Sequence, residues 1–316
     1  MNIPLSNRIK WYSSTGKMKL SFRREDNIFT MNGYDYLLRY LDEHKGNRGG
    51  NSNVFMLCDP ADPDNDAEHY VIKICKKPIE ESSKIYKKRF KREIYALGKV
   101  RSNSKNNFIV ESFQSGNIIM ENKRFPFYIM EYCNSDLTKY IEESELDITE
   151  KVTLCYYIIQ GFCDLHGLGI YHRDIKSDNF LMKENICKIG DLGLTEYRPM
   201  DVSLSIDETG DRIGAFGWES PEVMNKILTE ENGLSFDCNI DTASDIFQLG
   251  KLFWYIFQGN LPIGQVEQED FLIDDLELFK LIYKMLEYKK GENRRPVNIR
   301  NLKETFKPIA KKYSVI

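Results

Sequence analysis

The sequence predicts an α+β fold in which a small β-rich unit precedes a larger, mainly helical one. Within residues 37–131, short apolar and aromatic runs alternate with polar turns, which is the pattern of β-strands. Residues 81–98 interrupt these runs, because their apolar side chains recur at intervals of four and three and so share one helical face. Further helices are expected in the second half of the chain, at residues 149–166, 242–258 and 269–289.

The change of pattern near residue 132 sets the expected domain boundaries. Residues 1–36 are polar and mixed, with scattered aromatic residues but no sustained period, so we expect an N-terminal extension that packs on the main body. Residues 37–131 form the predicted β-rich lobe with its helix, and residues 132–316 form the predicted helical lobe. The sequence shows no internal repeat of the kind that builds solenoids or propellers.

Composition and charge disfavour several classes of protein. The 316 residues are 41% hydrophobic and 29% charged, an ordinary globular composition that argues against wholesale disorder. A formal net charge of -4 offers no global field that would gather polyanions, so no nucleic-acid partner is expected. The basic run at residues 84–92 could contact nucleic acid, but a solvated helical face is the simpler interpretation.

The cysteines and the apolar runs bear on location. Seven cysteines, with no pair spaced C-x-x-C, indicate reduced thiols and not a disulfide framework. The first residues contain no apolar signal-peptide core, and the longest apolar run, Leu252 to Phe257, is too short to span a membrane. We therefore expect a cytoplasmic protein with no membrane contact.

The strongest chemical signal is the string His-Arg-Asp-Ile-Lys-Ser-Asp-Asn at residues 172–179, followed by Asp-Leu-Gly at residues 191–193. Phosphoryl transfer requires a carboxylate near the attacking hydroxyl, oxygen ligands for metal ions, and cations beside the phosphates. A chance turn rich in Asp and Asn explains any one of these residues, but not the whole string. The string supplies each of the required groups, in Asp174, Lys176, Asn179 and Asp191.

These motifs resemble those of the eukaryotic-type protein kinase family, and the resemblance covers roughly residues 38–310. It implies a two-lobed protein kinase fold, with ATP and Mg²⁺ as cofactors and proteins as substrates. The resemblance assigns Asp174 as the catalytic base and Lys176 as a contact of the γ-phosphate. It assigns Asn179 as a ligand of the second magnesium ion and Asp191 as the carboxylate that bridges the metal. Lys176, two residues after the base, is the choice seen in Ser/Thr kinases.

The alternating segment Tyr-Val-Ile-Lys-Ile resembles the family's third strand, where a lysine pairs with the α and β phosphates. A lysine in a strand is, by itself, better explained as a solvated charge. Lys73 lies between apolar residues, however, and Glu93 follows on the predicted helix, so the resemblance implies a Lys73–Glu93 ion pair. Val71 stands where the family usually has alanine, which implies a bulkier wall of the adenine pocket.

The phosphate-covering loop is the weakest match to the family. The segment Lys-Gly-Asn-Arg-Gly-Gly-Asn-Ser-Asn-Val-Phe fits the glycine-rich pattern with Gly49 and Val54 retained. Asn47 and Ser52 stand where glycines are usual, although asparagine tolerates positive φ better than most residues. A hairpin turn rich in Gly and Asn is the alternative interpretation.

The segment Phe-Tyr-Ile-Met-Glu-Tyr-Cys resembles the last strand and the hinge of the family. The resemblance implies that Met130 is the gatekeeper and that the backbones of Glu131 and Cys133 meet adenine. It places Asp136 at the ribose hydroxyls, although a helix N-cap would look the same in the sequence. Leu181, just after the catalytic string, is assigned to the nucleotide site as well.

Further matches concern the activation segment and its supports. Gly-Trp-Glu-Ser-Pro-Glu, ending at Glu222, resembles the end of that segment and implies an ion pair between Glu222 and Arg295. Asp245 matches the buried residue that ties down the catalytic loop through its backbone. Ala215 stands where Ser/Thr kinases usually have a threonine that hydrogen-bonds the base, which bears on substrate class and efficiency.

Arg173, beside the base, implies an activation loop that is held by a phosphate. Ungapped counting back from Glu222 places Asp211 where the family often has a phosphothreonine, so we expect a built-in carboxylate and basal activity. An ordinary solvated loop residue is the alternative for Asp211. Autophosphorylation is expected to enhance activity at Ser203, Ser205 or Thr209.

The sequence therefore predicts a Ser/Thr protein kinase that uses ATP and Mg²⁺, with autophosphorylation. One alternative is a pseudokinase or nucleotide-binding scaffold, which the departures in the glycine-rich loop suggest and the intact Lys73 and Asp174 oppose. A second alternative is a small-molecule phosphotransferase of related fold. Such enzymes lack the combination of His-Arg-Asp and Ser-Pro-Glu found in this chain.

Overall fold

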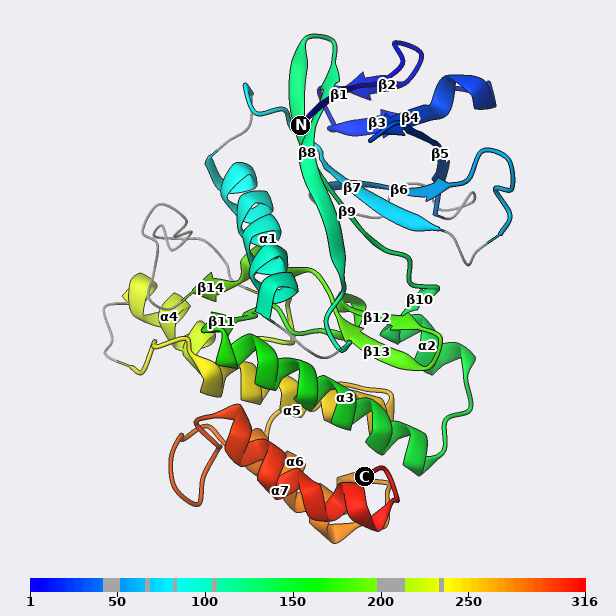
Figure 1. Cartoon of the computed structure of the whole chain (residues 1–316). Helices are drawn as coiled ribbons and strands as arrows, with labels where there is room; N and C mark the ends of the chain where they lie inside the picture. Colours follow the sequence, from blue (N-terminus) through cyan, green and yellow to red (C-terminus); the bar gives the residue numbers. More distant parts are fainter. Residues whose placement is uncertain (42–51, 66–68, 82–83, 104–106, 198–213, 233–235) are drawn as a thin grey trace. The chain divides into compact units, whose positions relative to one another are not determined.

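The computed structural model describes the chain except for residues 42–51, 66–68, 82–83, 104–106, 198–213 and 233–235 (Figure 1). The chain divides into two compact units. Residues 1–101 and 110–132 make up the first unit, and residues 102–109 and 133–316 make up the second. The first unit is rich in β-strands and the second is mainly helical, so the predicted α+β class is confirmed.

The first unit is built on a sheet whose described strands follow the order β1-β8-β9-β7-β6-β5-β4. The β1–β8 pair is parallel, and the other pairs along this order are antiparallel. Asn32-Gly33 and Glu121-Asn122 have positive φ, as tight hairpin turns require. The strands are β1 (Asn2–Pro4), β4 (Ile28–Met31), β5 (Tyr34–Tyr40), β6 (Ser52–Cys58), β7 (Tyr70–Cys75), β8 (Ser112–Met120) and β9 (Lys123–Glu131).

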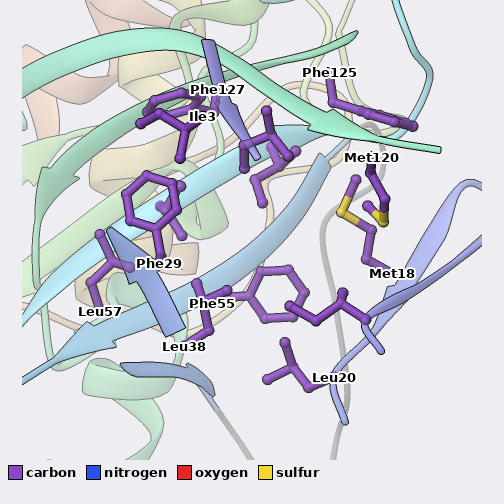
Figure 2. Packing of buried hydrophobic residues seen from close by; sticks show 14 of the residues in the cluster. Ile3, Met18, Leu20, Phe29, Leu38, Phe55, Leu57, Met120, Phe125 and Phe127 are labelled. Carbon is purple, nitrogen blue, oxygen red and sulfur yellow. The ribbon is translucent and has the colours of Figure 1, made fainter. Parts of the chain in front are cut away.

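One face of this sheet carries the main core of the unit. Side chains alternate between the two faces along a strand, so Phe55 and Leu57 of β6 share a face. Figure 2 shows them packed in a cluster with Met18, Leu20 and Phe29 from the N-terminal segment. A hairpin of β2 (Lys10–Tyr12) and β3 (Lys17–Lys19), followed by a 3-10 helix (Arg24–Asn27), belongs to that segment.

The opposite face carries Lys73 and the helix α1 (Lys84–Asn103). Lys73 has Val54 and Tyr128 as its cross-strand partners, so these three side chains share a face. The ring of Tyr128 lies 5.6 Å from that of Phe90 on α1. The unit is therefore layered, with the β2–β3 hairpin on one side of the sheet and α1 on the other.

The structure differs from the sequence prediction at residues 1–36. This segment is not only an extension on the surface of the body, because β1 and β4 form the two ends of the strand order and β2–β3 contributes to the core. Its strands have three or four residues each, which is too short for a period to be recognised in the sequence. The first unit therefore begins at residue 1, and its end at Tyr132 lies next to the predicted boundary.

Residues 102–109 belong to the second unit, which the sequence does not predict. The N–H of Ile189 donates to the carbonyl of Phe108 at 2.9 Å, and Ile109 forms a β-bridge with Ile189. The Phe108 ring stacks on Tyr157 with 4.9 Å between centroids. These contacts attach the connection after α1 to the helical unit.

The second unit consists mainly of helices whose N-termini are capped by acidic or amide side chains. Asp147 and Asp241 form capping boxes, and Asp275 and Asn298 cap later helices. The helices are α2 (Leu137–Glu143), α3 (Ile148–Gly167), α4 (Pro221–Asn232), α5 (Thr242–Gln258), α6 (Leu276–Met285) and α7 (Ile299–Lys312). None of the described helices is long and apolar enough to cross a bilayer.

Short strands position the loops between these helices. An antiparallel sheet joins β10 (Ser135–Asp136), β12 (Phe180–Lys183) and β13 (Ile186–Ile189). A second ladder pairs β11 (Ile170–Tyr171) with β14 (Glu196–Tyr197). The string at residues 172–179 thus lies between β11 and β12, and Asp191 follows β13 after one glycine.

Candidate functional site

The first group of predicted site residues surrounds Lys73 on β7. Its Nζ lies 2.7 Å from Oε1 of Glu93 on α1, so the predicted ion pair is confirmed. The hydroxyl of Tyr128 donates to the same carboxylate oxygen at 2.7 Å. The Glu93 side chain is 4% exposed and that of Lys73 is 14% exposed. A carboxylate this buried requires such partners, since an unpaired charge would be costly to desolvate.

The pair yields a prediction for activity. Lys73→Met and Glu93→Ala are each expected to lower phosphate transfer, and the double variant should be little worse than the worse single one. Residues that act as one unit are not additive, and contacts of this kind give coupling energies of roughly 0.5–3 kcal/mol. A double-mutant cycle on initial rates measures this coupling.

The exposed pair between Arg124 and Glu80, at 2.8 Å in the same unit, provides a matched control. Glu80→Ala should leave the rate close to wild type and should add independently to either single variant. Purely additive losses for Lys73→Met and Glu93→Ala would mean that Glu93 acts only as a structural carboxylate.

The sheet places further predicted nucleotide-site residues beside Lys73. Val71 is buried and has Met56 and Met130 as cross-strand partners. Val54 and Met130 are half-buried. Val54, Val71, Lys73 and Met130 therefore occupy three adjacent strands, whereas Gly49 lies outside the described residues.

The structure limits which backbone atom of Glu131 could contact adenine. Its N–H donates to the carbonyl of Glu111 at 3.0 Å, and its side chain accepts from the N–H of Glu111 at 2.8 Å. The N–H of Glu131 is thus already used within the first unit. Contact between the Glu131 backbone and adenine would have to use the carbonyl oxygen.

The other hinge residues lie in the second unit. Asp136 caps α2, since its Oδ1 accepts from the N–H of Lys139 at 2.8 Å, so the capping interpretation is confirmed. Leu181 is half-buried opposite Asp136 in the β10–β12 ladder. Cys133 is a half-buried cysteine, without a disulfide, at the start of this unit.

The catalytic string forms a hydrogen-bonded loop around Asp174. Asn179 Nδ2 donates to the carbonyl oxygen of Asp174 at 2.7 Å and to its Oδ2 at 3.0 Å. The N–H of Asp174 donates to Nδ1 of His172 at 3.3 Å, which assigns the ring proton to Nε2, 3.0 Å from the carbonyl of Gly190. The loop is therefore fixed both within itself and to the residue that precedes Asp191.

Asp191 follows β13 in a left-handed conformation, with φ 42°. Its side chain is exposed, and Oδ1 accepts from the N–H of Gly193 at 3.4 Å. Lys176 is half-buried, with Nζ 3.7 Å from Oδ2 of Asp178.

The electrostatics of the loop fit a divalent cation. Burial raises the pKa of the Asp174 carboxyl, and the charge of Asp191 adds to the increase, which His172 partly offsets. Asn179 uses its Nδ2 on Asp174, so its Oδ1 remains the ligand atom that it can offer. Carboxylate and amide oxygens are the ligands that Mg²⁺ prefers, and a cation would relieve the repulsion between the two carboxylates.

Asp245 on α5 fixes the same loop through hydrogen bonds to its backbone. It is fully buried and accepts from the N–H groups of His172 at 2.8 Å and Arg173 at 2.9 Å, so the predicted anchor is confirmed. Its Oδ2 also lies 2.9 Å from Nε2 of His166. Arg173 has φ 68°, a conformation that costs free energy unless neighbouring contacts hold it.

The supports of the activation segment are partly described. Glu222 forms the predicted ion pair with Arg295 and accepts from the hydroxyl of Ser244 at 2.9 Å. Ala215 lies among the described residues, and its carbonyl accepts from the N–H of Trp218 at 3.0 Å. The candidate regulatory positions lie outside the described residues, at Ser203, Ser205, Thr209 and Asp211.

Sequence reasoning missed three residues of these arrangements. Tyr128 shares Glu93 with Lys73, and only the β7–β9 register, which the sequence does not show, brings it there. The Thr138 hydroxyl lies 2.7 Å from the Ser177 hydroxyl and 2.9 Å from Asp178. Gln248, one helical turn after Asp245, contacts the N–H of Ile175, and this spacing could have drawn attention to it.

Comparison with known proteins gives a match over most of the chain. The model of the protein kinase domain matches residues 45–313. The sensor for unfolded proteins in the ER ire1 of Schizosaccharomyces pombe is 29% identical over 45% of this chain and 15% of its own length. The serine/threonine-protein kinase/endoribonuclease IRE1b of Arabidopsis thaliana is 35% identical over 39% of this chain and 13% of its own length.

A tyrosine kinase is among the similar proteins as well. Human protein-tyrosine kinase 6 is 29% identical over 43% of this chain and 28% of its own length. The matched part of this chain thus spans less than a third of each of these three relatives.

Proposed function

The chain belongs to the protein kinase family, and we propose that it transfers the γ-phosphate of ATP to serine and threonine hydroxyls of protein substrates. The observation that carries the proposal is the loop in which Asn179 holds the carboxylate of Asp174 at 3.0 Å. A carboxylate fixed in this way, beside an amide oxygen and a second carboxylate, can orient a hydroxyl and hold cations.

Each predicted residue has a role in this proposal. Asp174 accepts the proton of the attacking hydroxyl, and Lys73 and Lys176 offset the negative charge of the phosphates. Asn179 and Asp191 would hold Mg²⁺, which, when bound, neutralises charge that develops on the phosphoryl oxygens. Val54, Val71, Met130, Leu181 and the hinge backbone would contact the nucleotide.

Two observations support serine and threonine as acceptors, and two oppose them. Lys176 is the residue that Ser/Thr kinases have two positions after the base, and IRE1b is named a serine/threonine-protein kinase. Ala215 lacks the hydroxyl that those enzymes usually have, and a tyrosine kinase also matches. The acceptor class is therefore the part of the proposal to test first.

Incubation of the purified chain with Mg²⁺, labelled ATP and a generic acceptor protein should yield phosphoserine and phosphothreonine. Mass spectrometry identifies the modified residues on the acceptor and on the chain itself, where autophosphorylation is proposed. The Asp174→Asn variant, treated in the same way, measures the incorporation of label that does not depend on Asp174. Label on tyrosine alone would reassign the acceptor class, and no transfer despite nucleotide binding would favour a pseudokinase.

The remaining proposals concern partners and location. The word endoribonuclease in the name of IRE1b describes that relative, and the geometry of the described residues here favours phosphoryl transfer. The seven cysteines, all among the described residues, form no disulfide, which supports a reducing compartment, and we propose the cytoplasm.

A further inference from the structure

The β2–β3 hairpin contacts both of the strands that flank residues 42–51. The N–H of Met18 donates to Oδ1 of Asn53 on β6 at 2.9 Å. Two residues later, the N–H of Leu20 donates to the hydroxyl of Tyr40 on β5 at 2.9 Å. The N–H of Met18 in β3 and the N–H of Leu20, just after β3, thus bridge the end of β5 and the start of β6.

Asn53 is the centre of this bridge. Its side chain is fully buried, and Nδ2 donates to the carbonyl of Gly16 at 2.9 Å while Oδ1 accepts from Met18. Loss of the Asn53 amide would leave one buried donor and one buried acceptor of the hairpin without these partners, which is costly. The contacts with the hairpin therefore explain why an asparagine, with a donor and an acceptor in its side chain, occupies position 53.

A second attachment fixes the hairpin to the end of β7. Trp11 Nε1 donates to the carbonyl of Lys76 at 3.0 Å, and Lys77 Nζ donates to the carbonyl of Ser13 at 2.7 Å. Gly16 has φ +70°, and a Cβ there would lie 2.7 Å from Cβ of Lys76. The turn of the hairpin is thus seated against β7 so closely that only glycine fits.

The contacts of Asn53 lie on the face of the sheet opposite to Val54 and Lys73 of the predicted nucleotide site. Asn53 faces the hairpin, whereas the next residue, Val54, faces the other side of the sheet and pairs with Lys73. We propose that Asn53 is a positioning residue, through which the β2–β3 hairpin holds β6 in place so that Val54 and Lys73 bind ATP. This inference rests on the proposed function and goes beyond it, because it gives residues 10–19 a part in nucleotide affinity.

A matched pair of variants tests the role of Asn53. Asn27 is 6% exposed in the same unit, and its amide likewise accepts from one backbone N–H and donates to one carbonyl, both of Ser21. Asn53→Ala should raise the KM for ATP and the Kd for MgATP by about three- to tenfold, the range expected for lost hydrogen bonds. Asn27→Ala should leave both constants within about twofold of wild type, and kcat should change little in either.

A second variant covers the case in which Asn53→Ala does not fold. Tyr40→Phe removes the hydroxyl that Leu20 uses but keeps the ring, which lies 5.7 Å from that of Phe55. It should raise the KM for ATP by about twofold or more. Equal KM values for the two Asn variants, or an unchanged KM in Tyr40→Phe, would overturn the positioning role. Wild type that binds no MgATP would instead overturn the proposed function, and the inference with it.

Discussion

Asp174→Asn should reduce the rate of phosphate transfer by about 10²- to 10⁴-fold, which is the rate enhancement that a general base usually provides. The substituted amide has nearly the same shape as the carboxyl, so the contacts with Asn179 can largely persist, but it cannot accept the proton of the attacking hydroxyl. Affinity for ATP and the unfolding midpoint should stay near wild type. Initial rates at saturating ATP, with nucleotide titration and thermal unfolding in parallel, measure these three quantities.

Asp178 provides the control for this substitution. It lies in the same loop, is exposed, and contacts the Thr138 hydroxyl at 2.9 Å and, across a partly exposed pair at 3.7 Å, Nζ of Lys176. Asp178→Asn should therefore change the rate by less than about threefold, as expected for an exposed polar contact. Equal losses in the two variants would show that the loop responds to any charge removal, and full turnover in Asp174→Asn would contradict the proposed role of Asp174.

The confirmed parts of the site have one property in common. Lys73 with Glu93, Glu222 with Arg295, and Asp245 with the catalytic loop are each placed by motifs whose spacing is tied to a strand, a loop or a helix. Such residues are chosen by chemistry as well as by packing, so their types and intervals carry the information. The resemblance of these motifs to the protein kinase family therefore predicted these pairings.

What the sequence did not predict depends on register and on distant pairing. β1 lies parallel to β8, so Ile3 pairs with Ile118, and no local pattern in a three-residue strand indicates this. The same holds for Asn53. Its Gly- and Asn-rich surroundings suggest a turn residue, and only the structure shows its contact with the N–H of Met18. Tertiary contacts, and not local propensity, decide the structure of these residues.

The start of helix α6 is set by its N-cap residue and not by the apolar period of the sequence. The pattern predicts a helix over residues 269–289, but α6 begins at Leu276, after Asp275. The Asp275 carboxylate accepts from the N–H groups of Glu277 and Leu278, both at 3.1 Å, and so provides a strong N-cap. Phe271 remains buried outside the helix, where it contacts Trp254 and Phe257.

Asp245→Ala is expected to have the largest effect on stability. The carboxylate is fully buried and accepts from two backbone N–H groups and from His166. Its removal should cost roughly 3–5 kcal/mol, because it leaves several buried donors unsatisfied at about 1–3 kcal/mol each. Arg173 would also lose the contact that holds its backbone at φ 68°, so activity should fall as well. Asp241→Ala, at the N-cap of the same helix, should cost only about 0.5–2 kcal/mol.

The pH dependence of stability tests the charge of Asp245 directly. Burial by itself would raise its pKa, but the hydrogen bond and charge of His166, with the N–H of Arg173, hold the pKa below the ordinary value of 3.8. A folded-state pKa below that of the unfolded chain means that the carboxylate stabilises fully above about pH 4 and that this stabilisation is lost as the pH falls through the folded-state value. Asp245→Asn lacks this contribution, so its deficit relative to wild type in denaturant unfolding should narrow between pH 5 and pH 3. A deficit that stays constant or widens over that range would show that Asp245 is not held as a carboxylate by these neighbours.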